Sequence, residues 1–206
     1  MKEIDESVAE RHRRKMENRK AVQDAEVAEK TIEKGLLIVN TGPGKGKSTA
    51  AFGLALRMLG HQRKVAVVQF IKGAMQTGER ELIDKHFADL CEFHTMGEGF
   101  TWDTQDRSRD IAVTRTAWEE LKRMIADPSY RLVLADELNI VLRYGYLPVE
   151  EVVEALRAKP AMTHVVITGR NAPQELIDMA DLVTDMASIK HPFRDQNVRA
   201  QAGIEF

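Results

Sequence analysis

Residues Leu36–Thr49, with the sequence LLIVNTGPGKGKST, are the most informative stretch of this chain for its fold. Leu36–Val39 are four apolar residues that predict a short buried strand. A loop with three glycines follows, and Lys47, Ser48 and Thr49 then open an Ala- and Leu-rich helix, AAFGLALRML. The order of strand, glycine-rich loop, Lys-Ser and helix is the context of a phosphate-binding P-loop.

The groups of this loop suit a nucleotide triphosphate. Its glycines allow a tight backbone that points successive N–H groups at one anion, and the helix adds the positive end of its dipole. Lys47 brings a mobile positive charge, and Ser48 offers a hydroxyl to Mg²⁺. Thr41 stands where G-x-x-x-x-G-K-[ST] has its first glycine. The alternative is a glycine-rich turn before an ordinary helix. The predicted nucleotide site comprises Thr41, Gly42, Pro43, Gly44, Lys45, Gly46, Lys47, Ser48 and Thr49.

Size and composition narrow the class of protein. A chain of 206 residues with 43% hydrophobic residues suits one domain with a full core. The formal net charge of −2 argues against nucleic acid or an anionic membrane as the principal partner. Cys91 is the single cysteine, so no internal disulfide forms, which is compatible with a reducing cytoplasm. No signal segment or membrane-length apolar run is present, and we expect a cytoplasmic protein.

Residues 1–34 form a charged N-terminal unit that precedes the main domain, residues 35–206. Ile4, Val8, His12 and Met16 repeat every four residues and predict an extended helix with a thin apolar face. One interpretation is a solvated helical extension. The other is an arm that closes over a ligand or a neighbouring subunit, with its six basic residues between positions 11 and 20 facing an anionic partner.

The remaining sequence alternates strands and helices. Further strands are predicted at 65–70, 90–94, 132–135 and 164–168, and helices at 78–87, 106–126 and 149–159. Such alternation implies right-handed crossovers and a mainly parallel sheet covered on both faces. The predicted fold class is therefore α/β, a RecA-like P-loop NTPase fold with an N-terminal helical extension.

Chemically useful residues follow the predicted strands. Asp136 and Glu137 come directly after the strand at 132–135, a Walker B pattern in which one carboxylate holds Mg²⁺ opposite Ser48. Ligands gather at the carboxyl ends of parallel strands, so these groups should meet the P-loop. Arg170 follows the strand at 164–168, where it either contacts ribose, adenine or phosphate or is an ordinary surface arginine.

The segment 97–106 carries two aromatic residues, Phe100 and Trp102, on a glycine-flanked polar stretch with no helical or strand period. They are either anchors of a small core or an aromatic wall for a large planar ligand. Trp118 lies within a predicted helix and is interpreted as core. The six histidines show no metal-binding spacing, and we expect structural roles for His94, His164 and His191.

Several motifs in one order carry a family resemblance: TGPGKGKSTAAFG, VVQFIKG, GEGFTWDTQD, LADELN, LPVEEVVEAL, VVITGR and KHPFRDQNVRAQAGIEF. Together they resemble the P-loop family of ATP:corrinoid adenosyltransferases over residues 35–206, and the charged leader looks like that family's N-terminal helix. GFTWDTQ and AQ-x-GIEF are its more particular motifs. Pro43, Ser48 and Asn197 depart from residues common in the family, and each keeps the property that its position needs.

The resemblance implies that a corrinoid with Co(I) attacks the 5′ carbon of ATP and that inorganic triphosphate leaves. Mg²⁺, Lys47 and the loop N–H groups then stabilise the leaving group, with help from Lys45. By matching position, Phe100 and Trp102 pack below the corrin and displace the lower axial ligand, which eases reduction to Co(I). The N-terminal helix covers the corrinoid. A homodimer and a reducing flavoprotein as electron donor are also implied.

Some alternatives stay open. The family pattern favours Glu137 over Asp136 as the direct metal ligand, and the corrinoid is either cobalamin or a precursor such as cobyrinic acid a,c-diamide. A second hypothesis is an ATPase or kinase in which Glu137 polarises a water or hydroxyl. A third is a non-enzymatic RecA-like nucleotide switch with the basic leader as docking arm.

Overall fold

The computed structural model describes residues 2–71, 77–96 and 106–205 of the chain. Phe100 and Trp102 lie outside the described residues. Internal contacts form two compact units, residues 1–33 and 34–206, and each is described by itself.

The first unit is one helix, α1 (Lys2–Ala28). The helix predicted over residues 2–34 thus ends at Ala28. Every side chain of α1 from Val8 to Ala28 is exposed, and Val22 keeps 69% of its surface accessible. The apolar residues are too few to cover a core, and ion pairs such as Arg13–Glu17, 3.0 Å apart one turn along the helix, suit a solvated surface.

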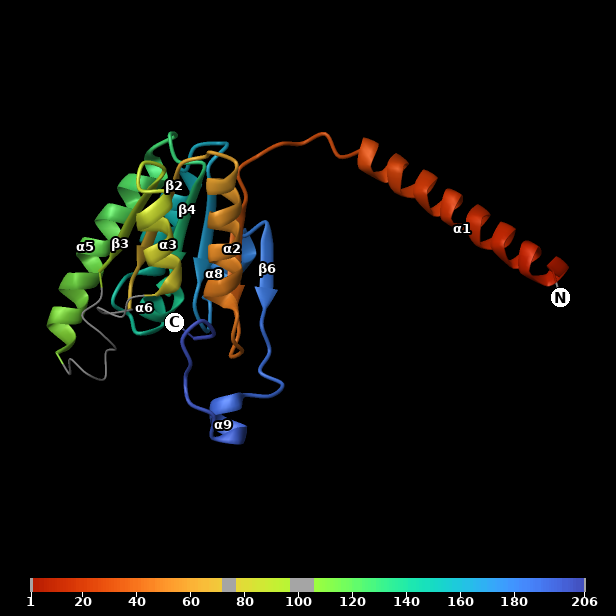
Figure 1. The fold of residues 1–206 in the computed structure, drawn as a ribbon. Coiled ribbons are helices and arrows are strands. Elements are labelled where there is room, and N and C mark those ends of the chain that lie inside the picture. Colours follow the sequence, from red (N-terminus) through yellow and green to blue (C-terminus); the bar gives the residue numbers. More distant parts are fainter. Residues whose placement is uncertain (1, 72–76, 97–105, 206) are drawn as a thin grey trace. The chain divides into compact units, whose positions relative to one another are not determined.

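The second unit is built on a six-stranded sheet in the order β3-β2-β4-β5-β1-β6 (Figure 1). Each strand pair in the described residues is parallel. The strands are β1 (Leu37–Thr41), β2 (Val65–Gln69), β3 (Cys91–Thr95), β4 (Leu132–Asp136), β5 (His164–Thr168) and β6 (Leu182–Asp185). The helices are α2 (Lys47–Gly60), α3 (Gly78–His86), α5 (Arg107–Ala126), α6 (Leu138–Arg143), α7 (Val149–Arg157), α8 (Gln174–Met179) and α9 (Pro192–Gln196).

Helices cover both faces of this sheet, and alternate residues of the inner strands are buried on opposite sides. Ile38 belongs to a core cluster with Phe52 of α2 and Ile83 of α3. Its neighbour Val39 belongs to the other cluster, which α5, α6, α7 and α8 contribute to and which contains Trp118. The α/β architecture with a parallel sheet is therefore confirmed, as is the core position of Trp118.

Four of the described elements were not predicted: α6, α8, β6 and α9. They have four to six residues each, too short for a hydrophobic period to emerge. The turn before α6 was also hidden, since Glu137 takes a left-handed conformation where glycine would be the usual signal. No described helix has both the length and the hydropathy of a membrane span.

The strand register defines where the site forms. Gln69 of β2 lies beside Asp136 of β4, and Asn40 of β1 lies beside Thr168 of β5. Thr41 of β1 lies beside Asp185 of β6. These polar residues lie at or next to the carboxyl ends of their strands, where ligands of parallel α/β folds bind.

Candidate active site

The glycine loop connects β1 to α2 with two residues of positive φ, Gly42 at 96° and Gly46 at 102°. Gly46 precedes α2 as its N-cap residue. A side chain at Gly42 would overlap the carboxylate of Asp185, and one at Gly44 would overlap the backbone after β6. Glycine is thus required at position 42 both by backbone conformation and by close packing.

The segment that follows β6 packs directly on this loop. The N–H of Gly44 donates a 2.6 Å hydrogen bond to the carbonyl of Met186. Lys45 forms an ion pair with Glu205 near the C-terminus. Residues of the C-terminal part therefore line the loop, although sequence reasoning assigned no site residue there; the match of KHPFRDQNVRAQAGIEF to the family was the signal that could have found them.

Two polar residues of β1 anchor the loop at its ends. The Asn40 side-chain amide donates to the carbonyl of Lys47 at 3.3 Å and is buried. The Thr41 hydroxyl accepts a 3.0 Å bond from the N–H of Ala172, which follows β5. Asn40 was not among the predicted site residues, and Thr41, at the position where the motif usually has glycine, has a structural partner of its own.

Lys47 is buried and folds back over the loop. Its ammonium donates to the carbonyl of Gly42 at 2.9 Å and also to that of Gly44. Burial lowers the pKa of Lys47 below its usual value, the charge of Glu137 opposes that shift, and the charge of Arg170 adds to it. Lys47, Glu137 and Arg170 were predicted as site residues from three separate parts of the sequence, and the charges of Glu137 and Arg170 both act on the Lys47 ammonium group.

The carboxylates after β4 differ in environment. Asp136 is fully buried and accepts from Gln69 Nε2 at 2.9 Å and from the Thr168 hydroxyl at 2.7 Å. Glu137 is half-buried, has a φ of 64°, and donates its backbone N–H to Thr168 Oγ1 at 2.9 Å. Gln69 and Thr168 were missed because isolated polar residues at strand ends are common.

The turn after β5 brings Arg170 to the site. Gly169 has a φ of 124°, and an added Cβ would lie 2.9 Å from Cβ of Asn139. Asn139 is buried and donates through Nδ2 to the Gly169 carbonyl at 3.0 Å. Arg170 is half-buried and lies close enough for its charge to act on Lys47. Of the other predicted residues, Ser48 is half-buried, and Pro43 and Thr49 are exposed.

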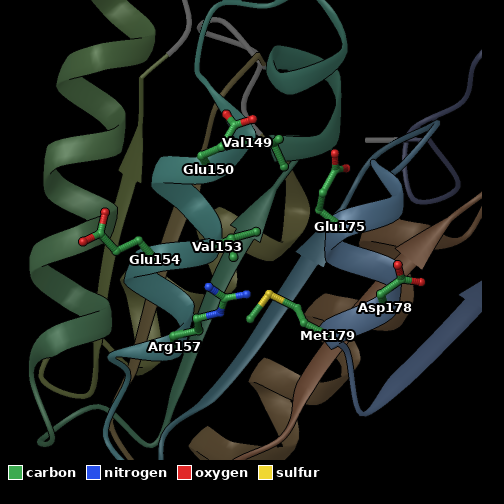
Figure 2. A pocket seen from close by; sticks show the side chains of 8 residues that line it. All are labelled: Val149, Glu150, Val153, Glu154, Arg157, Glu175, Asp178 and Met179. Carbon is green, nitrogen blue, oxygen red and sulfur yellow. The ribbon is translucent and has the colours of Figure 1, made fainter.

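A separate groove of about 740 Å³ lies between α7 and α8. Figure 2 shows Arg157 and Met179 pointing toward each other across it. Four exposed carboxylates and one guanidinium line it, so it would repel an anionic triphosphate, and no glycine-loop residue contributes to it. Its lining residues are Val149, Glu150, Val153, Glu154, Arg157, Glu175, Asp178 and Met179.

One histidine has neighbours of the metal-binding type. Ligand atoms of His94, Glu92 and Glu120 lie within 4.8 Å of one another. Arg123 forms ion pairs with both glutamates, so a guanidinium already occupies the cationic position between them. This cluster ties β3 to α5 and suits a structural role for His94.

Comparison with known proteins identifies the class of this chain. Residues 33–206 match the family model of the ATP:corrinoid adenosyltransferases BtuR/CobO/CobP, and residues 5–27 match that of the cob(I)alamin adenosyltransferase N terminus. A corrinoid adenosyltransferase of Sinorhizobium sp is 60% identical over 197 residues, which cover 95% of this chain and 92% of the relative. The corrinoid adenosyltransferases of Pseudomonas aeruginosa and Escherichia coli K12 are 51% and 48% identical, over 96% of this chain and 96% and 98% of theirs.

The chain is thus an enzyme of the adenosyltransferase class. It belongs to the ATP:corrinoid adenosyltransferase family, which confirms the resemblance drawn from its motifs. Family membership favours ATP-dependent adenosylation of a corrinoid over the ATPase or kinase hypothesis and over a non-enzymatic switch.

Proposed function

We propose that the chain joins the 5′ carbon of ATP to the Co(I) centre of a corrinoid and releases inorganic triphosphate. The Co–C5′ bond forms as the C5′–O5′ bond breaks. Cobalt supplies the electron pair of the new bond and passes formally from Co(I) to Co(III), and the triphosphate oxygen keeps the pair of the broken bond. The observation that carries this proposal is the buried Lys47 over its glycine loop, with Glu137 and Arg170 acting on its charge.

The proposed site stabilises the triphosphate as it leaves. Lys47 and the N–H groups of residues 45–49 face developing negative charge, a role that preorganised donors perform at low cost in reorganisation. Arg170 is proposed to contact the nucleotide, because its guanidinium lies near the same ammonium group. No general base is required, since Co(I) is itself the nucleophile, so positioning of C5′ against cobalt is the remaining task.

The donor set fits Mg²⁺, which prefers carboxylate and hydroxyl oxygens. We assign Ser48 and Glu137 as ligands, with Asp136 behind them, because both oxygens of Asp136 already accept hydrogen bonds from Gln69 and Thr168. When bound, the ion would neutralise charge on the triphosphate. The chain's own contribution is to hold a half-buried carboxylate near Lys47.

The fold supports a more specific assignment as a RecA-like P-loop NTPase fold. The loop follows β1, an interior strand of the parallel sheet, and α2 begins at its Lys47, while an acidic pair follows at the end of β4. Residues 1–34 would form the helical arm and residues 35–206 the adenosyltransferase domain.

The corrinoid side of the proposal comes from the family resemblance. Phe100 and Trp102 would form an apolar wall below the corrin ring, displacing the lower axial ligand and excluding water from cobalt. The N-terminal arm would cover the ring in a homodimer. A reducing flavoprotein would supply electrons, and the cytoplasm is the compartment consistent with this chemistry.

Product analysis tests the proposal. The full chain is incubated without oxygen with ATP, Mg²⁺ and chemically reduced cobalamin, and in parallel with cobyrinic acid a,c-diamide. We expect triphosphate in equal amount to the alkylated corrinoid, and none when corrinoid is omitted. ADP or single phosphate as the product would instead support the ATPase or kinase hypothesis. The two corrinoids are compared by kcat/KM.

A further inference from the structure

The backbone of Glu137 is held in an unfavourable conformation. Its φ of 64° and ψ of 19° lie in the left-handed region, where the Cβ of a non-glycine residue is crowded. Such a conformation persists only when surrounding contacts enforce it, and it often marks a functional position. The residue sits between β4 and α6, so its backbone angle sets the direction in which its side chain leaves the sheet.

A single hydroxyl joins both carboxylate residues at this point. Thr168 Oγ1 accepts from the N–H of Glu137 at 2.9 Å and donates to Asp136 Oδ1 at 2.7 Å. Gln69 donates to the other oxygen of Asp136 at 2.9 Å. Thr168 and Asp136 are both fully buried. Side-chain hydrogen bonds thereby connect the carboxyl ends of β2, β4 and β5, where the site lies.

Both of these hydrogen bonds depend on the hydroxyl group of Thr168. A valine at position 168 has nearly the same shape, but the buried Asp136 oxygen loses its donor and the Glu137 N–H loses its acceptor. Both losses favour rotation of the 136–137 peptide toward a more common backbone conformation. The carboxylate of Glu137 would then turn away from Lys47, on whose charge it now acts.

We propose that Thr168 is a positioning residue that holds Glu137 so that its carboxylate faces the divalent cation of the nucleotide site. The inference rests on the proposed function, because it assumes that Glu137 binds the cation that accompanies ATP. Thr168 touches neither substrate in this assignment and acts only through Glu137 and Asp136.

The test measures cation binding apart from turnover. Mn²⁺ binding to the full chain with ATP, without corrinoid, is followed by electron paramagnetic resonance for Thr168→Val, Thr168→Ala and Thr168→Ser. Groups that orient metal ligands typically change metal affinity by about 10- to 100-fold. We expect a loss of about tenfold or more for the valine and alanine variants, and near-normal affinity for the serine variant, which keeps the hydroxyl.

Thr163→Val is the matched control. Thr163 is also buried and directly precedes the other end of β5, where its hydroxyl donates to the Tyr130 carbonyl at 3.1 Å. Its loss should lower stability without changing Mn²⁺ affinity. In a Glu137→Gln background, Thr168→Val should have no further effect on Mn²⁺ affinity, because the residue that it positions is already missing.

The inference is overturned if folded Thr168→Val or Thr168→Ala binds Mn²⁺ as the parent does, or if Thr163→Val loses as much affinity. Full additivity with Glu137→Gln would also overturn it. Circular dichroism establishes that each variant is folded, and the alanine variant serves if the valine variant does not fold. If the parent chain binds no Mn²⁺ with ATP or forms no triphosphate, the proposed function itself fails; if only the Thr168 effects are missing, that function stands without this inference.

Discussion

The ammonium group of Lys47 donates a 2.9 Å hydrogen bond to the carbonyl oxygen of Gly42, five residues earlier in the same loop. The loop thus closes on its own lysine, and the charge is buried at the position proposed for phosphate. Burial lowers the pKa of this ammonium group. An anion bound beside it would act in the opposite direction and favour its charged form.

Replacing Lys47 with alanine should remove this charge from the triphosphate site. By analogy with the loss of one preorganised donor, we expect kcat to fall by about 10²–10³-fold. Release of triphosphate under reducing conditions is the measurement. Arg57→Ala is the control, because Arg57 is an exposed cation in the last turn of α2. Activity of Lys47→Ala close to that of the parent would contradict the assigned role.

Asp136 and Glu137 should respond differently to neutral substitution. Glu137→Gln should raise the Mg²⁺ concentration needed for half-maximal rate and leave stability nearly unchanged. Asp136→Asn places an amide against the donors Gln69 and Thr168, so the free energy of unfolding should fall by about 1–3 kcal/mol. Urea denaturation and Mg²⁺ titration separate the two effects. A larger Mg²⁺ effect with unchanged stability in Asp136→Asn would make Asp136 the direct ligand.

Phe100→Ala and Trp102→Ala should affect reduction more than alkyl transfer. The proposed aromatic wall eases the step from Co(II) to Co(I), so reactions that begin from Co(II) should lose more rate than those given chemically prepared Co(I). Trp118→Phe, a change within the buried core, is expected to affect both reactions equally. Equal losses in both assays for the Phe100 and Trp102 variants would leave these aromatics with a packing role.

Removal of residues 1–30 should leave the α/β unit folded. The cut preserves Lys34, which pairs with Asp181 before β6, and removes a helix whose described side chains are exposed. We expect a melting temperature close to that of the parent and a raised KM for the corrinoid with an unchanged KM for ATP. A truncated chain that cannot fold would show that residues 1–30 belong to the core.

Cys91 should be unreactive in the folded chain. Burial raises the pKa of its thiol to about 12, whereas the unfolded thiol ionises near 9. Iodoacetamide at pH 8 should therefore label the protein slowly until urea is added.

The same shift predicts how stability changes with pH. Between pH 9 and about 12 the unfolded state loses a proton that the folded state keeps, so this group's contribution to stability falls as pH rises, by at most about 1.4 kcal/mol per unit. Cys91→Ala should lack that part of the pH dependence in urea denaturation. Rapid labelling of the folded parent at pH 8 would contradict the burial of this thiol.

Much of the fold was predictable because its signals are local. The strands at 65–70, 132–135 and 164–168 were predicted within one residue of their ends, since buried parallel strands are continuous apolar runs. As predicted, the helix that ends at Ala126 starts at Asp106, its N-cap residue. The carboxylate of Asp106 accepts hydrogen bonds from the N–H groups of Ser108 and Arg109. The C-terminal elements β6 and α9 escaped prediction because they are short, and β6 also depends on pairing with the distant strand β1.

Consecutive residues were enough to specify the strand, the glycine loop and the position of Lys47 at a helix start, because backbone preferences act over a few neighbours. They did not reveal that Thr168 connects Asp136 to Glu137, or that Met186 accepts a bond from Gly44. Those partners are brought together by the strand order β3-β2-β4-β5-β1-β6, which makes neighbours of residues more than a hundred positions apart. The long-range packing of the sheet, which no local pattern encodes, brought these residues together at the carboxyl ends of the strands.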